Sequence, residues 1–157
     1  MDYKLITDSR EQKPLPFRKN NETKKLDAGD YAAEYNGVLL PVVFDRKNPA
    51  DAMQTLMQGH DRFTRELGVA YQNNQKLIMI VECSYTNFIT KNFDGGRHSK
   101  IRPDVLTKIL HSTMLSHDLE IVFCNSRSEM IKYIRNYFNA LIKYELKHNK
   151  EKYNVVA

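Results

Sequence analysis

Two aspartates and a lysine in the first third of the chain could together carry out metal-assisted chemistry. Asp45 and Lys47 stand two residues apart, and Asp30 precedes them. Mg²⁺ and Mn²⁺ prefer oxygen ligands, and two adjacent carboxylates repel each other unless a cation lies between them. Such a cation lowers the pKa of a bound water and neutralises charge on a phosphate. Lys47 could then orient that water, help to deprotonate it, or stabilise a negative transition state. The set indicates hydrolysis of a phosphate ester if the fold brings the three together.

A β-hairpin is the element that must position these side chains. Asn36-Gly37 separates two runs of strand-forming residues, and this dipeptide favours a two-residue turn in which both residues have positive φ. With that turn, Asp30 is expected opposite Val43. Asp45 would then be the diagonal neighbour of Asp30 on one face, with backbones roughly 7–8 Å apart, and Lys47 would follow on the same face because alternate residues share a face.

The rest of the chain predicts an α/β domain. Strands are expected at 4–7, 23–26, 31–35, 38–44, 77–81 and 119–124, and helices from Pro49 to Gly59, at 60–71, at 104–116 and from Ser126. The unbroken apolar run 77–81 indicates a strand covered on both faces, and 84–102 is expected to be a long loop. This order predicts a mixed central sheet with helices on both faces, in one domain over 1–147 with a polar tail over 148–157.

Composition narrows the class of protein without naming a function. A chain of 157 residues with 41% hydrophobic and 27% charged residues is typical of a single globular domain. No signal-peptide layout and no apolar run near the ~20 residues of a membrane span are present, so we expect an intracellular protein of the cytoplasm, nucleoid or nucleus. The net charge of +5 favours a polyanionic partner. Cys83 and Cys124 form no zinc pattern and are expected to be buried thiols.

Three ordered motifs resemble the nuclease domain of XPF-family structure-specific endonucleases. The family carries D-x-R-E, G-D-Y and E-R-K-x-x-x-D elements in this order. The chain has Asp8-Ser9-Arg10-Glu11, then Gly29-Asp30-Tyr31, then Asp45-Arg46-Lys47 followed by Asp51. Gly59-His60-Asp61-Arg62 resembles the family's Gly-Arg with two residues inserted, and Leu77 to Glu82 resembles the apolar strand that follows. The resemblance covers residues 4–83 well, and the remainder only in its pattern of elements.

The resemblance implies a restriction-endonuclease-like fold and metal-dependent cleavage of DNA at branched, forked or flapped structures, in repair or recombination. It implies Mg²⁺ or Mn²⁺ as cofactor, DNA as partner, and a homodimer. The implied catalytic group is Asp30, Asp45, Lys47 and Arg46, the implied metal-site acids are Asp8, Asp30, Asp45 and Asp51, and the candidate DNA-contacting residues are Arg10, Arg62, Arg97, Lys100 and Arg102. By strand alternation, the Arg46 side chain is expected on the face opposite Lys47, paired with an acid or a carbonyl.

Two departures from the family pattern keep other functions open. Asp45 stands where the family usually has Glu, and the chain contains no helix-hairpin-helix module. DNA would then be held by the domain itself, by a dimer partner or by an accessory DNA-binding protein. The alternatives are a catalytically silent DNA-binding or scaffold subunit, and an RNA or mismatch nuclease on the same fold.

Several residues have a structural interpretation as well as a functional one. Asp51 suits the first turn of a helix, Glu66 is expected to pair with Arg62 one turn before it, and Glu82 could approach the metal or pair with an arginine. The basic segment 91–102 could contact phosphate or be a solvated loop. His111 and His117 are weak metal-ligand candidates. Apolar residues of the last helix form a stripe that could be core or a dimer face: Met130, Tyr133, Ile134, Tyr137, Leu141 and Tyr144.

Overall fold

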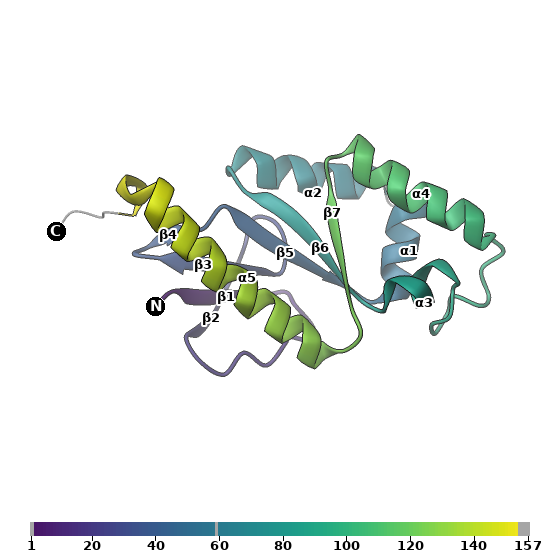
Figure 1. Ribbon diagram of the computed structural model, residues 1–157, viewed down its shortest axis with the longest axis horizontal. Coiled ribbons are helices and arrows are strands. Elements are labelled where there is room, and N and C mark those ends of the chain that lie inside the picture. Colours follow the sequence, from purple (N-terminus) through teal and green to yellow (C-terminus); the bar gives the residue numbers. More distant parts are fainter. Residues whose placement is uncertain (1, 59, 154–157) are drawn as a thin grey trace.

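A mixed seven-stranded sheet forms the centre of the protein and carries helices on both faces (Figure 1). The computed structural model describes residues 2–58 and 60–153. The strands are β1 (Lys4–Asp8), β2 (Asn21–Lys24), β3 (Tyr31–Tyr35), β4 (Val38–Leu39), β5 (Val42–Lys47), β6 (Lys76–Glu82) and β7 (Glu120–Cys124). The helices are α1 (Pro49–Met57), α2 (His60–Gln72), α3 (Tyr85–Ile89), α4 (Pro103–Ser116), α5 (Arg127–His148) and the short 3₁₀ helix η1 (Lys150–Lys152). The predicted α/β class is confirmed.

The strand order is β2-β1-β3-β5-β6-β7, with β4 paired to β3. β1 runs antiparallel to β3, and β3 antiparallel to β5. β5, β6 and β7 are parallel, joined by helical crossovers. β6 is almost wholly buried because it lies between two parallel neighbours and is covered on both faces, as its apolar sequence predicts.

Each face of the sheet has its own hydrophobic core. On one face, side chains such as Met79 and Val81 pack with residues of α1, α2, α3 and α4. On the other face, Phe44 and Ile80 pack with α5, which crosses the sheet in Figure 1. Since successive strand residues point to opposite faces, a strand residue's position decides whether it faces the α1 and α2 side or the α5 side.

The Asn36-Gly37 turn forms as predicted, but the strand after it does not continue unbroken. Both turn residues have positive φ, 51° and 78°, and Tyr35 pairs with Val38. Pro41 lacks an N–H and cannot donate to the ladder, and the strand is interrupted between β4 and β5. Beyond the interruption Tyr31 pairs with Phe44, a register two residues further than the turn alone predicts.

Helix α1 begins as its sequence predicts. The Asn48 side chain accepts the N–H of Asp51, and Pro49 opens the first turn. The helix ends at Met57, and the prediction that Gly59 ends it falls on a residue outside those described.

The segment 84–102 is not one long loop as predicted. Ser84 accepts the N–H of Asn87 and starts the short helix α3. Five-residue helices carry too little periodicity to be seen in sequence. Phe88 of this helix is fully buried and stacks on Phe93, so the segment is anchored to the core on the α1 face.

The buried stripe of α5 differs in part from the predicted one. Its buried apolar residues follow a four-residue spacing: Met130, Ile134, Phe138 and Ile142. Tyr137 lies edge-on to Phe44 with ring centroids 5.3 Å apart and so belongs to the core side. Tyr144 is 59% exposed and packs on His148 instead, because the sheet lies under the other row of the helix. The core interpretation therefore holds for the stripe up to Leu141, and Tyr144 was wrongly included.

Part of the predicted C-terminal tail is packed. Tyr153 is buried, 1% exposed, and lies edge-on to Tyr35 of β3. The amide of Asn36 donates to its carbonyl at 3.0 Å. The residues up to Tyr153 therefore belong to the folded domain.

Candidate active site

Three acids lie in one row across the sheet. The pairing of Tyr31 with Phe44 continues to place Asp30 opposite Asp45, and the pairing of Ile6 with Ala32 continues to place Asp8 opposite Asp30. The prediction that Asp30 lies opposite Val43 is wrong, because the break at Pro41 moves the register by two residues. A shift of two preserves the face of every side chain, so the shared face was predicted correctly. Asp30 and Asp45 are direct neighbours, closer than the diagonal geometry required.

The Asp30 carboxylate is held by the backbone of β5. Its Oδ2 accepts the N–H of Arg46 at 2.8 Å, and its own N–H donates to the Phe44 carbonyl at 2.7 Å. Burial, followed by the charge of Asp45, raises the pKa of Asp30 from 3.8 to about 8. Ionisation of both carboxyl groups at neutral pH is therefore unfavourable unless a further cation compensates their charge.

Asp45 is a buried acid with one unsatisfied oxygen. The residue is 5% exposed, and its Oδ2 is buried without a hydrogen-bond partner. Lys47 Nζ lies 3.3 Å from this oxygen as an ion pair, without hydrogen-bond geometry. Burial acts most strongly on the pKa of Lys47 and lowers it, but the neighbouring acids Asp45, Glu66 and Asp30 together outweigh burial and the pKa is raised. Lys47 therefore shares the face of Asp45, as alternation predicts.

Asp8 shares the row but directs its carboxylate elsewhere. Arg10 contacts both of its oxygens, at 3.1 and 3.3 Å, and the N–H of Leu26 donates to Oδ1 at 2.8 Å. Arg10 also donates to the Leu26 carbonyl at 2.7 Å, although its side chain remains 60% exposed. The Asp8 oxygens thus hold the loop before Asp30, and the exposed side of Arg10 is the part available to another molecule.

Arg46 lies on the α5 face, away from Lys47, as expected. Its guanidinium makes two 3.1 Å hydrogen bonds to Glu11, and both side chains are largely buried. Tyr31 donates its hydroxyl to Glu11 and accepts the N–H of Leu15 at 2.7 Å. Placed within this network, the Arg46 side chain supports the strand. Only its backbone N–H reaches the site, through Asp30.

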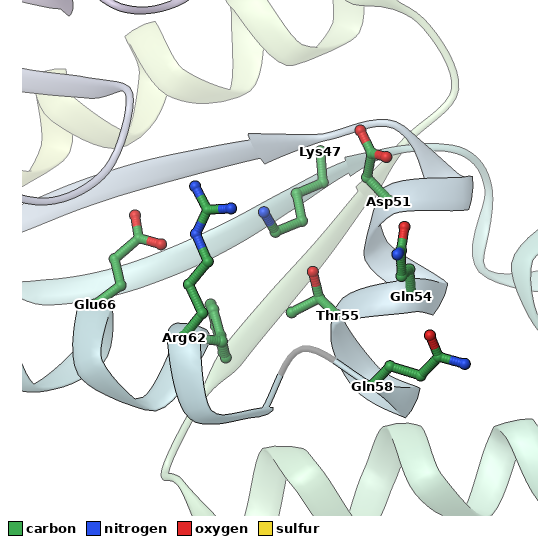
Figure 2. A pocket seen from close by; sticks show the side chains of 8 residues that line it. Lys47, Asp51, Gln54, Thr55, Gln58, Arg62 and Glu66 are labelled. Atoms are coloured by element: carbon green, nitrogen blue, oxygen red, sulfur yellow. The ribbon is translucent and has the colours of Figure 1, made fainter.

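A polar cleft of about 560 Å³ opens beside Lys47 (Figure 2). Lys47 and Arg62 extend into it from β5 and α2 (Figure 2). The rest of its lining comes from α1, the residue after it and α2: Asp51, Gln54, Thr55, Gln58, Phe63 and Glu66. Asp30 and Asp45 are not among the lining residues, and Lys47 joins the cleft to the pair through its contact with Asp45. Two cations and several amide or hydroxyl groups form a surface that suits a phosphodiester chain.

Asp51 serves first as a helix-capping residue. Its N–H donates to Asn48 Oδ1 and its Oδ2 accepts from the Asn48 amide, each at 2.8 Å. It lines the cleft near Lys47 but is exposed. Within residues 2–58 and 60–153, no group of three or more His, Cys, Asp or Glu side chains is suited to hold a metal ion. The four predicted metal-site acids are thus not brought into one group, and the pair Asp30 and Asp45 remains.

The basic segment 91–102 packs beside the start of α1. A Cβ on Gly95 would lie 3.6 Å from the Cβ of Ala50. Arg97 donates to Asn92 at 2.7 Å, Arg102 pairs with Asp104 at 3.0 Å, and Lys100 is exposed. The structure therefore places these three side chains on a neighbouring surface of the domain, outside the acid row.

Sequence reasoning missed the part that Glu66 plays. Glu66 was expected to pair with Arg62, but its Oε1 accepts the N–H of Gly29 at 3.1 Å. Burial, then the charge of Asp45, raises the pKa of Glu66, so this acid lies near the site. The i, i+4 spacing is compatible with either partner, and only the packing of α2 against the strand decides between them.

The other candidate groups lie apart from the acid row. Glu82 alternates with Val81 and faces the α5 side. His111 contacts the Tyr85 hydroxyl at 2.9 Å, and the His117 ring lies 6.1 Å from that of His60. Both cysteines are free and buried, as expected. Of the helices that the structure describes, none combines the length and apolarity of a membrane span.

Comparison with known proteins identifies the family. The model of the ERCC4 domain matches residues 2–137. The chain belongs to the ERCC4-domain family. No curated protein sequence matches it. XPF from Aeropyrum pernix is 17% identical with a TM-score of 0.64, covering 94% of this chain and 69% of that one. XPF from the same organism in complex with DNA has 17% identity and a TM-score of 0.66, covering 95% and 70%.

These likenesses confirm two predictions from the sequence. The ERCC4-domain match confirms the resemblance to XPF-type nuclease domains, and the structural matches confirm the restriction-endonuclease-like fold. Membership of this family supports DNA endonuclease as the class of activity.

Proposed function

We propose that this ERCC4 domain is a metal-dependent endonuclease that hydrolyses phosphodiester bonds in DNA. The observation that carries the proposal is the Asp30 and Asp45 pair. The two carboxylates oppose each other on neighbouring strands, and a buried oxygen of Asp45 has Lys47 3.3 Å away as an ion pair but no hydrogen-bond partner. Such an arrangement destabilises the folded protein unless a bound group compensates the charge and the unpaired oxygen when the protein is active.

The donor set supports Mg²⁺ or Mn²⁺ as that group. Mg²⁺ is commonly held by one or two protein carboxylates, with waters and substrate phosphate oxygens completing its shell. Asp30 and Asp45 would supply the two carboxylates. When bound, the cation would lower the pKa of a water and offset charge on the phosphate. Asp45 is one methylene shorter than the usual Glu, so its reach depends on the close approach of β3 and β5.

The chain's own residues would orient the DNA around this pair. Lys47 lies close enough to Asp45 to hold a water or a phosphate oxygen beside it. Arg62 extends into the same cleft and would contact the backbone of the DNA, and the exposed part of Arg10 would do so on the other side of Asp30. Arg97, Lys100 and Arg102 would extend this phosphate-binding surface along the molecule.

Recognition by phosphate contacts suits branched DNA, because such contacts follow the path of a backbone and do not read its bases. The structural neighbour that is a complex with DNA supports DNA as the partner. We include a homodimer in the proposal, since two copies would hold two arms of one junction. Light scattering of the purified protein, with and without a four-way junction, measures that state.

The decisive experiment incubates the protein with forked, flapped, four-way and plain duplex DNA, in Mg²⁺, Mn²⁺ or chelator. The Asp45→Asn variant keeps the size of the side chain and removes its charge. Asp61→Asn, an exposed acid in the first turn of α2, is the matched control. We expect cuts that require both the cation and Asp45, strongest on branched substrates. Tight binding without cuts in any metal would instead establish a silent DNA-binding subunit, and preferential cutting of RNA or mismatched duplexes would redirect the substrate class.

A further inference from the structure

Helix α2 contacts the turn that precedes Asp30. Glu66 Oε1 accepts the N–H of Gly29 at 3.1 Å, across 37 positions of sequence. Gly29 directly precedes Asp30 and has φ of +74°, and a Cβ there would lie 2.4 Å from Val43. The position therefore has no room for a side chain, and α2 holds the Gly29 peptide through Glu66.

The segment that presents Asp30 is thus fixed at both ends. On the strand side, Asp30 donates its N–H to the Phe44 carbonyl and accepts the N–H of Arg46. On the helix side, Glu66 accepts the N–H of Gly29, whose peptide directly precedes Asp30. Figure 2 shows the Glu66 carboxylate on the same side of the cleft as the Arg62 guanidinium, above α2.

We propose that Glu66 is a positioning residue of the metal centre, which orients the Asp30 carboxylate toward Asp45 by holding the Gly29 peptide. This inference rests on the proposed function, because it concerns the same cation. Helix α2 then has two roles: Glu66 supports metal binding, and Arg62 contacts the DNA. Groups that orient metal ligands typically change metal affinity by about 10- to 100-fold when they are removed.

The positioning role differs from a direct part as a third carboxylate. One oxygen of Glu66 is engaged by the peptide, and the described residues contain no three-acid group suited to a metal. Positioning needs only an acceptor oxygen at the end of a side chain of this length. A ligand or an electrostatic role needs the negative charge. Two variants of matched size separate these requirements.

Glu66→Gln keeps the acceptor oxygen and the length but removes the charge. Glu66→Met keeps the length and the helix propensity but removes the acceptor. Asp61→Asn on the same helix is again the control. Calorimetric titration of each protein with Mn²⁺, without DNA, gives the dissociation constant, and amide hydrogen exchange at Gly29 reports the contact itself. Thermal unfolding by circular dichroism verifies that each variant is folded, and Glu66→Ala replaces the Met variant if the latter does not fold.

We expect Glu66→Met to weaken Mn²⁺ binding at least 10-fold and to expose the Gly29 amide, while Glu66→Gln stays within 3-fold of the unmodified protein and keeps the amide protected. Equal losses in both variants would overturn the positioning role, because charge would then be the requirement. An unchanged dissociation constant in the Met variant would also overturn it. If the unmodified protein binds no Mn²⁺, the proposed metal dependence fails, and this inference falls with it. If the unmodified protein binds Mn²⁺ and the Glu66 variants bind it equally well, the inference is refuted and the proposed function is not.

Discussion

Replacing Asp30 by Asn should stabilise the metal-free protein at neutral pH. Burial and the charge of Asp45 raise the pKa of Asp30 to about 8, against its ordinary value of 3.8. A carboxyl group whose pKa is raised by folding favours the folded state fully below its unfolded pKa, and this contribution is lost as pH rises through the folded pKa. The folded protein at pH 7 must therefore either keep a proton on Asp30 or bear the charge at a cost.

The size of this effect follows from the same shift. One pKa unit corresponds to about 1.4 kcal/mol. At pH 7 the raised pKa of Asp30 therefore lowers the free energy of unfolding by up to about 4 kcal/mol. Asparagine retains the oxygen that accepts the Arg46 N–H and adds an amide that can donate to Asp45. In a chain of this length, each kcal/mol gained corresponds to roughly 2–4 °C in Tm.

Thermal and urea unfolding of both proteins in chelator, from pH 4 to 8, measures the difference. We expect the gap in favour of Asp30→Asn to be small at pH 4 and to widen up to pH 8. Adding Mg²⁺ should narrow it, because the cation stabilises only the protein that binds it. Asp61→Asn should show no such pattern. A variant no more stable than the unmodified protein at pH 7, or a gap that does not change with pH, would refute the account of this site as two opposed buried carboxylates.

Three further predictions concern buried groups elsewhere in the domain and beside the site. Arg46→Ala removes the cation that pairs with the buried Glu11, so we expect a loss of about 3 kcal/mol in the free energy of unfolding. A double-mutant cycle with Glu11→Ala should show strong non-additivity. Gly29→Ala places a methyl group 2.4 Å from Val43 in a backbone conformation with positive φ, and denaturant titration should show a loss of at least about 2 kcal/mol; equal stability would mean that the turn can relax. Burial raises the pKa of Cys124 to about 11, so mass spectrometry after treatment with a thiol reagent at pH 8 should find it unmodified in the native protein and labelled after unfolding.

Local features of the sequence predicted most of the elements correctly. The Asn36-Gly37 turn, the Asn48 cap with Pro49, and the apolar strand β6 each depend on preferences of a few consecutive residues. The family motifs indicated which acids along the chain belong to the candidate site. Because strand alternation has a period of two, even the shared face of Asp30 and Asp45 was predictable, despite a register that was not.

Prediction failed where two distant segments compete for one side chain. The contacts of Asp8 with Arg10 and the Leu26 peptide were not predicted, and its part in the metal site stays a prediction. Glu66 was assigned to Arg62 but binds Gly29. A carboxylate accepts hydrogen bonds from an arginine and from a peptide N–H alike, so the spacing along the chain cannot tell which donors it meets. The helix α3 escaped prediction for a different reason, since its five residues are shorter than the window over which periodicity is visible.

The sequence by itself determined which groups exist and which face of each element they occupy, because backbone preferences and periodicity act over a few residues. The tertiary structure decided how these groups meet. The break at Pro41 set Asp30 directly against Asp45, and the packing of α2 brought Glu66 to the turn before Asp30. Such contacts join segments far apart in the chain, so their geometry depends on how whole strands and helices pack.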